Sequence, residues 1–137
     1  MRLRADAGEI LLLGELALAS IALEVATRLA PLDRLIATLS GPTRRLAFFA
    51  PLPSDPERLA ELVALATRAT RRSCLVRSLL LLWVLRAQGH PALLRLGVAT
   101  TTTSLRAHSW VELEGRALGE ASATRDGLTV VAGLRGA

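Results

Sequence analysis

Cys74 is the single cysteine of the 137-residue chain, and it follows Ser73 at the expected start of a helix. A lone cysteine in an apolar chain is most often a small buried hydrophobe. At a helix N-terminus, however, unpaired backbone N–H groups and the helix dipole stabilise a thiolate and donate to an oxyanion. Arg71 and Arg72 add positive potential nearby. Cys74 is therefore a candidate nucleophile for acyl transfer.

His108 is the candidate base. It lies on an expected strand over residues 106–113, in which polar and apolar side chains alternate. The alternation places His108, Trp110 and Glu112 on one face of the strand, opposite the face that carries Ser109 and Val111. A histidine on a strand is often only a satisfied core residue, so its role depends on what lies beside it.

Glu120 is the candidate orienting acid, and the argument for it depends on the turn after the strand. A three-residue loop, Leu113-Glu114-Gly115, gives Gly115 the left-handed bulge position and sets His108 opposite Glu120. A two-residue loop, Glu114-Gly115, instead pairs Glu120 with the neighbour of His108 and puts the acid on the other face. The sequence favours the first register, in which nucleophile, base and acid form a triad.

The elements that position these residues indicate an α+β fold, with helices first and an antiparallel sheet after them. Asp55 and Pro56 mark a helix start, and the helix after Ser73 is apolar on all faces, which is typical of a buried core helix. We expect a helical N-terminal region over 1–55 and a core domain over 56–137. The expected helices cover 9–30, 32–39, 56–72 and 74–88, and the expected strands cover 92–101, 106–113, 117–121 and 128–134.

Composition argues against several functions. The net charge of +5 comes from 17 scattered arginines without any lysine, and aromatic residues make up only 3%, which does not favour nucleic-acid binding. One cysteine excludes an internal disulfide, and with two histidines it falls short of a closed zinc site. We therefore expect no metal and no cofactor.

The apolar run over 9–30 is long enough for a membrane span, but Glu15 and Glu24 interrupt it. Asp6 and Glu9 also offset the basic flank that a signal peptide needs. We expect a helix that packs on the core or on a partner, in a cytoplasmic protein.

Several segments together resemble the transglutaminase-like cysteine peptidase domain. The Cys-bearing leucine-rich helix is followed by Gln88-Gly89-His90-Pro91, a strand, and the segment Ala-His-Ser-Trp-Val-Glu over 107–112. Within that superfamily, the chain is most similar to the leader peptidases of lasso-peptide biosynthesis, often called B2 proteins. The resemblance covers residues 56–121.

This resemblance implies a function and a set of roles. Such peptidases remove the leader from a ribosomally made precursor peptide, and a separate ATP-dependent cyclase then acts on the freed core. Cys74 corresponds to the nucleophile and His108 to the general base and acid. Glu120 matches the acid position, where the family often has Asp, and Asp126 is a distant second candidate.

The resemblance also implies partners. No winged-helix leader-recognition domain is evident before residue 56, so the chain is similar to split forms that use a separate, B1-type recognition protein. The expected partners are therefore the precursor leader, that recognition protein and the cyclase. Two alternatives stay open: an amidase or acyltransferase on the same scaffold, and a non-catalytic interaction module in which Cys74 and His108 are core residues.

Overall fold

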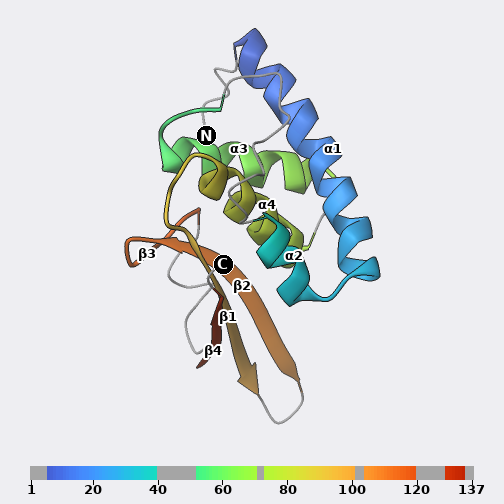
Figure 1. Ribbon diagram of the computed structural model, residues 1–137, viewed down its shortest axis with the longest axis vertical. Helices are drawn as coiled ribbons and strands as arrows, with labels where there is room; N and C mark the ends of the chain where they lie inside the picture. Colours follow the sequence, from blue (N-terminus) through green and yellow to red (C-terminus); the bar gives the residue numbers. More distant parts are fainter. Residues whose placement is uncertain (1–5, 40–51, 71–72, 101–103, 120–128, 135–137) are drawn as a thin grey trace.

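The computed structural model describes residues 6–39, 52–70, 73–100, 104–119 and 129–134 (Figure 1). Four helices come first, and a sheet follows them, which confirms the expected α+β class. The helices are α1 (Ala7–Leu29), α2 (Leu32–Leu39), α3 (Pro56–Ala69) and α4 (Cys74–Ala87). The strands are β1 (Leu93–Thr100), β2 (Leu105–Leu113), β3 (Arg116–Ala117) and β4 (Thr129–Leu134). The division into regions 1–55 and 56–137 stays a prediction.

Each of the three longer helices begins with a side-chain cap. Asp6 Oδ1 accepts from the Glu9 N–H at 2.8 Å at the start of α1. Asp55 Oδ1 accepts from the Glu57 N–H at 3.2 Å, and Pro56 is the first residue of α3, as the sequence predicts. These caps satisfy N–H groups that the helices themselves leave without a partner.

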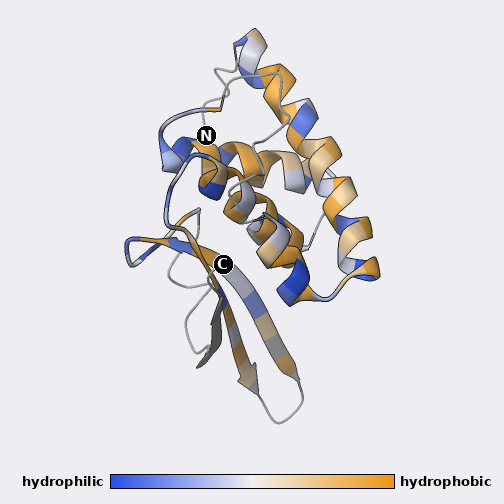
Figure 2. Ribbon diagram, viewed as in Figure 1, coloured by the Kyte–Doolittle hydropathy of each residue, from blue (hydrophilic) through white to orange (hydrophobic). Residues whose placement is uncertain are grey.

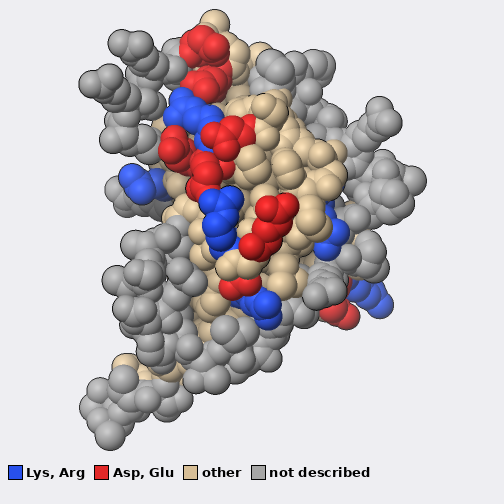
Figure 3. All heavy atoms as spheres, turned by 90° about the vertical axis from the view of Figure 1, so that its left-hand side faces the viewer, with Lys and Arg blue, Asp and Glu red and all other residues tan. Residues whose placement is uncertain are grey.

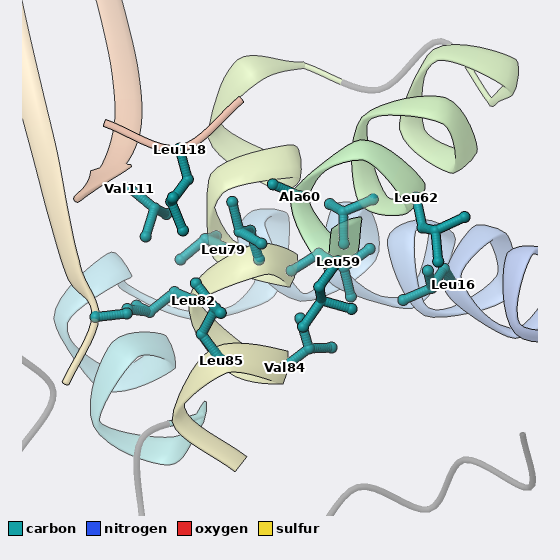
Figure 4. Packing of buried hydrophobic residues seen from close by; sticks show 14 of the residues in the cluster. Leu16, Leu59, Ala60, Leu62, Leu79, Leu82, Val84, Leu85, Val111 and Leu118 are labelled. Carbon is teal, nitrogen blue, oxygen red and sulfur yellow. The ribbon is translucent and has the colours of Figure 1, made fainter. Parts of the chain in front are cut away.

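Helix α4 is the central core helix, as its apolar sequence predicts. Eight of its 14 residues are buried, because α1 and α3 cover one side and the sheet covers another. In the core close-up, Val111 and Leu118 point from the sheet toward Leu79 of α4, while Leu59 and Leu16 approach from the helical side (Figure 4). The first residue of α4 is therefore held by a helix that is fixed on several sides.

The sheet is antiparallel in the order β3-β2-β1-β4. The longest pairing joins β1 to β2, with Leu96 opposite Ser109 and Gly97 opposite His108. The β1–β4 pairing shifts by one residue between Leu96 and Gly97. The extra residue is Val131 on β4, so the shift leaves the β1–β2 pairing that carries His108 continuous.

The β2–β3 hairpin corrects the predicted register. Leu113 pairs with Arg116, so the loop is the two-residue segment Glu114-Gly115 and not the three-residue loop that the sequence favours. Glu114 has a φ of 52° and Gly115 a φ of 79°. Two positive φ values are those of a type I′ turn, whose twist matches the twist of paired strands. The favourable twist outweighs the strain that a non-glycine residue meets at positive φ.

Helix α1 has two apolar faces. Its inner face buries Leu12, Leu16, Ser20 and Leu23 against α3 and α4. Six large apolar residues lie on its exposed side, which we call the outer stripe of α1, and they are 44–81% exposed (Figure 2). They are Ile10, Leu11, Leu18, Ile21, Val25 and Leu29. By length and composition α1 could cross a membrane, although its inner face packs on the rest of the protein.

An ion pair fixes α1 to α3. Arg58 donates from Nη2 to Glu9 Oε2 at 2.7 Å and from Nε to Glu9 Oε1 at 3.1 Å. Hydrogen bonds to Glu9 and Glu61 raise the pKa of the Arg58 guanidinium above its ordinary value, so Arg58 stays charged at physiological pH. This bidentate geometry orients the two helices as well as attracting them.

Candidate active site

Cys74 is the first residue of α4, at the position that the sequence predicts. Ser73 is the N-cap, and its Oγ accepts from the Val76 N–H at 3.3 Å. The Arg77 N–H donates to the Ser73 carbonyl at 3.1 Å. The thiol is half-buried and forms no disulfide, so a reagent or substrate can reach it.

The first turn of α4 provides donors beside this thiol. The cap uses the N–H groups of Val76 and Arg77, whereas those of Cys74 and Leu75 have no acceptor among the described residues. Such N–H groups at the positive end of a helix stabilise a thiolate or an oxyanion. The local structure therefore has the two features that thiol acyl transfer needs, a nucleophile and an anion-stabilising site.

His108 lies on β2 and lines the same cavity as Cys74. Its ring stacks with that of Trp110 at a centroid distance of 6.0 Å and an interplanar angle of 21°. Trp110 is 3% exposed, and its Nε1 donates to Glu112 Oε1 at 3.1 Å. His108, Trp110 and Glu112 thus share the face of β2 opposite to Ser109, as the alternation predicts. Ser109 is the residue that faces α4, His108 lines the Cys74 cavity, and stacking restricts the orientation of the imidazole.

The cavity between these two residues has a volume of about 340 Å³. Helices α2 and α4 and strands β1 and β2 all contribute to it. Its described lining consists of Leu32, Cys74, Leu75, Leu96, Gly97, Val98, Ala107, His108 and Ser109. The fold therefore brings the candidate nucleophile and the candidate base, which are 34 residues apart in the sequence, to one apolar cavity.

A buried hydrogen bond links the helix of the nucleophile to the strand of the base. Ser109 Oγ donates to Ser78 Oγ at 3.3 Å, and each serine is 2% exposed. Ser78 is four residues after Cys74 and therefore lies on the same face of α4. Ser109 directly follows His108. This polar contact in an apolar interface fixes the position of α4 along β2.

Glu120 and the second candidate, Asp126, lie outside the described residues. The observed register pairs Glu112 with Ala117 in place of Arg116, and β3 ends at Ala117. The hairpin argument for Glu120 is therefore removed, and its role as the acid stays a prediction from the resemblance alone.

Two contributors to the site were not singled out in the sequence. Leu32, at the start of α2, lines the cavity although it lies far from Cys74 in the chain. Only the tertiary packing reveals this contact, because no local pattern marks it. The role of Ser78 could have been predicted from the sequence, because it is a polar residue in an apolar helix and lies four residues after the candidate nucleophile.

A larger cavity of about 570 Å³ lies at the other end of α4. It is lined by Arg86, Arg95, Glu112 and Glu114 among others, and it contains no thiol. Arg95 Nε binds Glu112 Oε2 at 3.1 Å, so two of these charges neutralise each other. Within the described part of the chain, no group of three or more His, Cys, Asp or Glu side chains is placed to hold a metal ion.

Comparison with protein families identifies the superfamily of the chain. The family model described as the transglutaminase-like superfamily matches residues 17–133, which is most of the chain. The chain belongs to the transglutaminase-like superfamily. The match extends beyond the predicted motif region of 56–121 and includes much of α1 and all of α2. No curated protein and no solved structure matches the chain significantly.

Membership gives the residues of the site a chemical context. Transglutaminase-like domains typically carry cysteine-peptidase-type chemistry. In this transglutaminase-like chain the single cysteine begins the core helix, and a histidine on a neighbouring strand shares its cavity. The superfamily part of the predicted resemblance is therefore confirmed.

Proposed function

We propose that this protein is a cysteine peptidase that removes the leader from a ribosomally synthesised lasso-peptide precursor. The observation that carries the proposal is the position of Cys74 on the first residue of α4, in one cavity with His108. The superfamily supports the cysteine chemistry, and the motif over 107–112 supports the narrower leader-peptidase assignment.

Cleavage by this site follows the thiol acyl-transfer scheme. His108 accepts the thiol proton, and Cys74 Sγ attacks the carbonyl carbon of the scissile amide. The N–H groups of Cys74 and Leu75 stabilise the oxyanion of the tetrahedral intermediate. When the C–N bond breaks, His108 gives its proton to the leaving nitrogen, so the core peptide departs with a free α-amine and the leader stays as a thioester on Cys74.

The second half of the reaction releases the leader. His108 accepts a proton from a water molecule, which attacks the thioester carbonyl. The C–S bond breaks, Cys74 leaves as the thiolate and is reprotonated, and the leader departs with a new carboxylate. In this proposal Glu120 orients His108, and no metal or cofactor takes part. An amidase or acyltransferase would share the first half-reaction and differ in the acceptor of the acyl group.

The proposed partners are the precursor leader, a separate leader-recognition protein and the ATP-dependent cyclase. The outer stripe of α1 supports a protein partner, because six of the seven exposed large apolar residues in the described part of the chain lie on this one helix. An apolar patch of this kind is typical of an interaction surface. We propose that the recognition protein binds there and that the protein acts in the cytoplasm.

Charge distribution does not favour nucleic acid as a partner. Among the described residues on the face shown in Figure 3, acidic and basic side chains lie next to one another and form no single-sign patch. Pairs such as Arg58 with Glu9, and Arg116 with Glu57, account for part of this mixture. A phosphate-binding surface needs clustered positive charge.

The test is mass spectrometry of a leader–core precursor incubated with this protein and its recognition partner. We expect one cut at the leader–core junction, and Cys74→Ala to reduce its rate at least about 10³-fold, because removal of a nucleophile abolishes covalent catalysis. Leu105→Ala is the control, since Leu105 is 69% exposed and lies outside the cavity.

Two results would contradict the proposal. Full cleavage by Cys74→Ala would exclude Cys74 as the nucleophile. An intact precursor in a mixture with confirmed binding of leader and partner would favour the interaction module. A product with an added group, in place of a free carboxylate, would instead identify an acyltransferase.

A further inference from the structure

The cavity beside Cys74 has aliphatic walls on several sides. Leu32 enters from α2, Leu75 from α4, and Leu96 and Val98 from β1. The pairing of Leu96 with Ser109 places both on the face of the sheet that meets α4. The aliphatic side chains therefore surround the space into which a group bound next to the thiol would extend.

The polar groups of the described lining are already in use. Ser109 Oγ donates to Ser78 Oγ, and both side chains are buried. Cys74 and His108 are the reacting pair of the proposed function. No Asp, Glu, Lys or Arg is among the described lining residues. The N–H groups of Cys74 and Leu75 are the donors that the proposed mechanism reserves for the oxyanion, so the described lining favours an apolar over a polar substrate side chain.

We propose that this cavity binds an aliphatic side chain of the peptide substrate, next to the bond that Cys74 cleaves, and that Leu32 and Val98 determine this specificity. The inference rests on the proposed function, because it takes Cys74 as the attacking atom. A volume of about 340 Å³ is near the lower end of the roughly 300–1,000 Å³ found for small-ligand sites. It suits a single aliphatic side chain with the adjoining peptide unit.

A pair of isosteric alkylating probes tests the inference without a precursor peptide. N-isobutyl-2-chloroacetamide carries an aliphatic branch, and N-(carbamoylmethyl)-2-chloroacetamide replaces that branch by an amide of the same shape. In each case the Cys74 thiolate forms an S–C bond and chloride leaves. Because Cys74 is the only cysteine, the intact mass of the protein reports the rate at this one residue.

We expect the folded protein to react with the isobutyl probe at least about tenfold faster than with the amide probe. Apolar pockets discriminate by about 10- to 200-fold for a single methylene. Leu32→Asn and Val98→Thr keep the side-chain shape but add polar atoms, and each is expected to lower the preference to less than about threefold. Leu105→Asn, the same change at an exposed residue outside the cavity, should leave it unchanged.

Iodoacetamide is too small to fill the cavity, so its reaction rate reports the reactivity of Cys74 alone. It therefore separates the proposed function from the inference about the cavity. If Cys74 reacts with iodoacetamide but shows no preference between the probes, the inference is overturned and the proposed function stands. A preference that survives both Leu32→Asn and Val98→Thr also overturns it. If folded Cys74 reacts with none of the three reagents while the unfolded chain reacts with all, the proposed function fails too.

Discussion

The two ends of α4 open onto two different cavities. At the N-terminal end, about 340 Å³ of aliphatic space adjoins Cys74 and the N–H groups of the first turn. At the C-terminal end, a larger space of about 570 Å³ is lined by charged residues, among them Arg86 and Glu114. The described lining of the larger cavity includes no thiol, and the helix end beside it carries carbonyl groups and negative partial charge.

This difference leads us to expect the anion-stabilising site from helix direction and not from cavity size. The N-terminus of a helix carries a partial charge of roughly +0.5 and the C-terminus roughly −0.5. An oxyanion is therefore favoured beside the first turn of α4, whereas the positive side chain of Arg86 complements the carbonyl groups of the last turn. The comparison predicts that changes at the two ends of α4 have unequal effects on catalysis.

The largest difference is expected between His108→Gln and Glu114→Gln. His108→Gln removes the proton acceptor at the N-terminal cavity, and we expect precursor cleavage to slow by about 10²- to 10⁴-fold. Glu114→Gln introduces the same residue at the exposed rim of the other cavity, where it removes one carboxylate, and cleavage should stay within about twofold. Single-turnover cleavage rates and thermal unfolding of each variant provide the measurement.

The interaction-module alternative predicts the reverse pattern for His108. There the histidine is a structural residue stacked on Trp110. His108→Gln would then lower the unfolding temperature, and the precursor would stay uncut with the wild type and the variant alike.

A smaller effect is expected from the hydrogen bond that fixes α4 on β2. Ser78→Ala leaves the buried Ser109 hydroxyl without this partner and should cost about 1–3 kcal/mol of stability. The double variant Ser78→Ala/Ser109→Ala removes both hydroxyls and should recover most of that stability. If the serine pair also positions Cys74 relative to His108, the kcat of the double variant stays at least about tenfold below that of the wild type.

The double variant separates two roles of the serine pair, because it should regain stability while still lacking the contact that positions Cys74. Denaturant unfolding measures the stability of the single and double variants, and kcat and KM are measured on the same samples. If the double variant has the kcat of the wild type, the serine pair is only a hydrogen-bonded contact in the core and does not position the site.

Local sequence signals predicted the helices well. Asp55 with Pro56 marked the start of α3, and Ser73 with Cys74 marked the start of α4, because capping depends on residues that are adjacent in the chain. The burial of α4 followed from apolar residues on all its faces. These features placed Cys74 at the N-terminus of the core helix without any tertiary information.

Non-local features were harder to predict. The hairpin register was wrong, since Glu114 adopts a positive φ that a glutamate seldom takes and that the sequence does not mark. The contribution of Leu32 to the cavity depends on the packing of α2 against α4. The β1–β4 pairing likewise joins segments that are separated by β2 and β3.

The central claim is that the fold activates Cys74, and the alkylation rate of this one thiol tests it most directly. The protein is treated with iodoacetamide at neutral pH, folded and in urea, and the single adduct is followed by intact mass. We predict faster alkylation in the folded protein, because the first turn of α4 stabilises the thiolate. Protection of Cys74 in the folded protein relative to the unfolded chain would contradict the account and identify it as a buried structural residue.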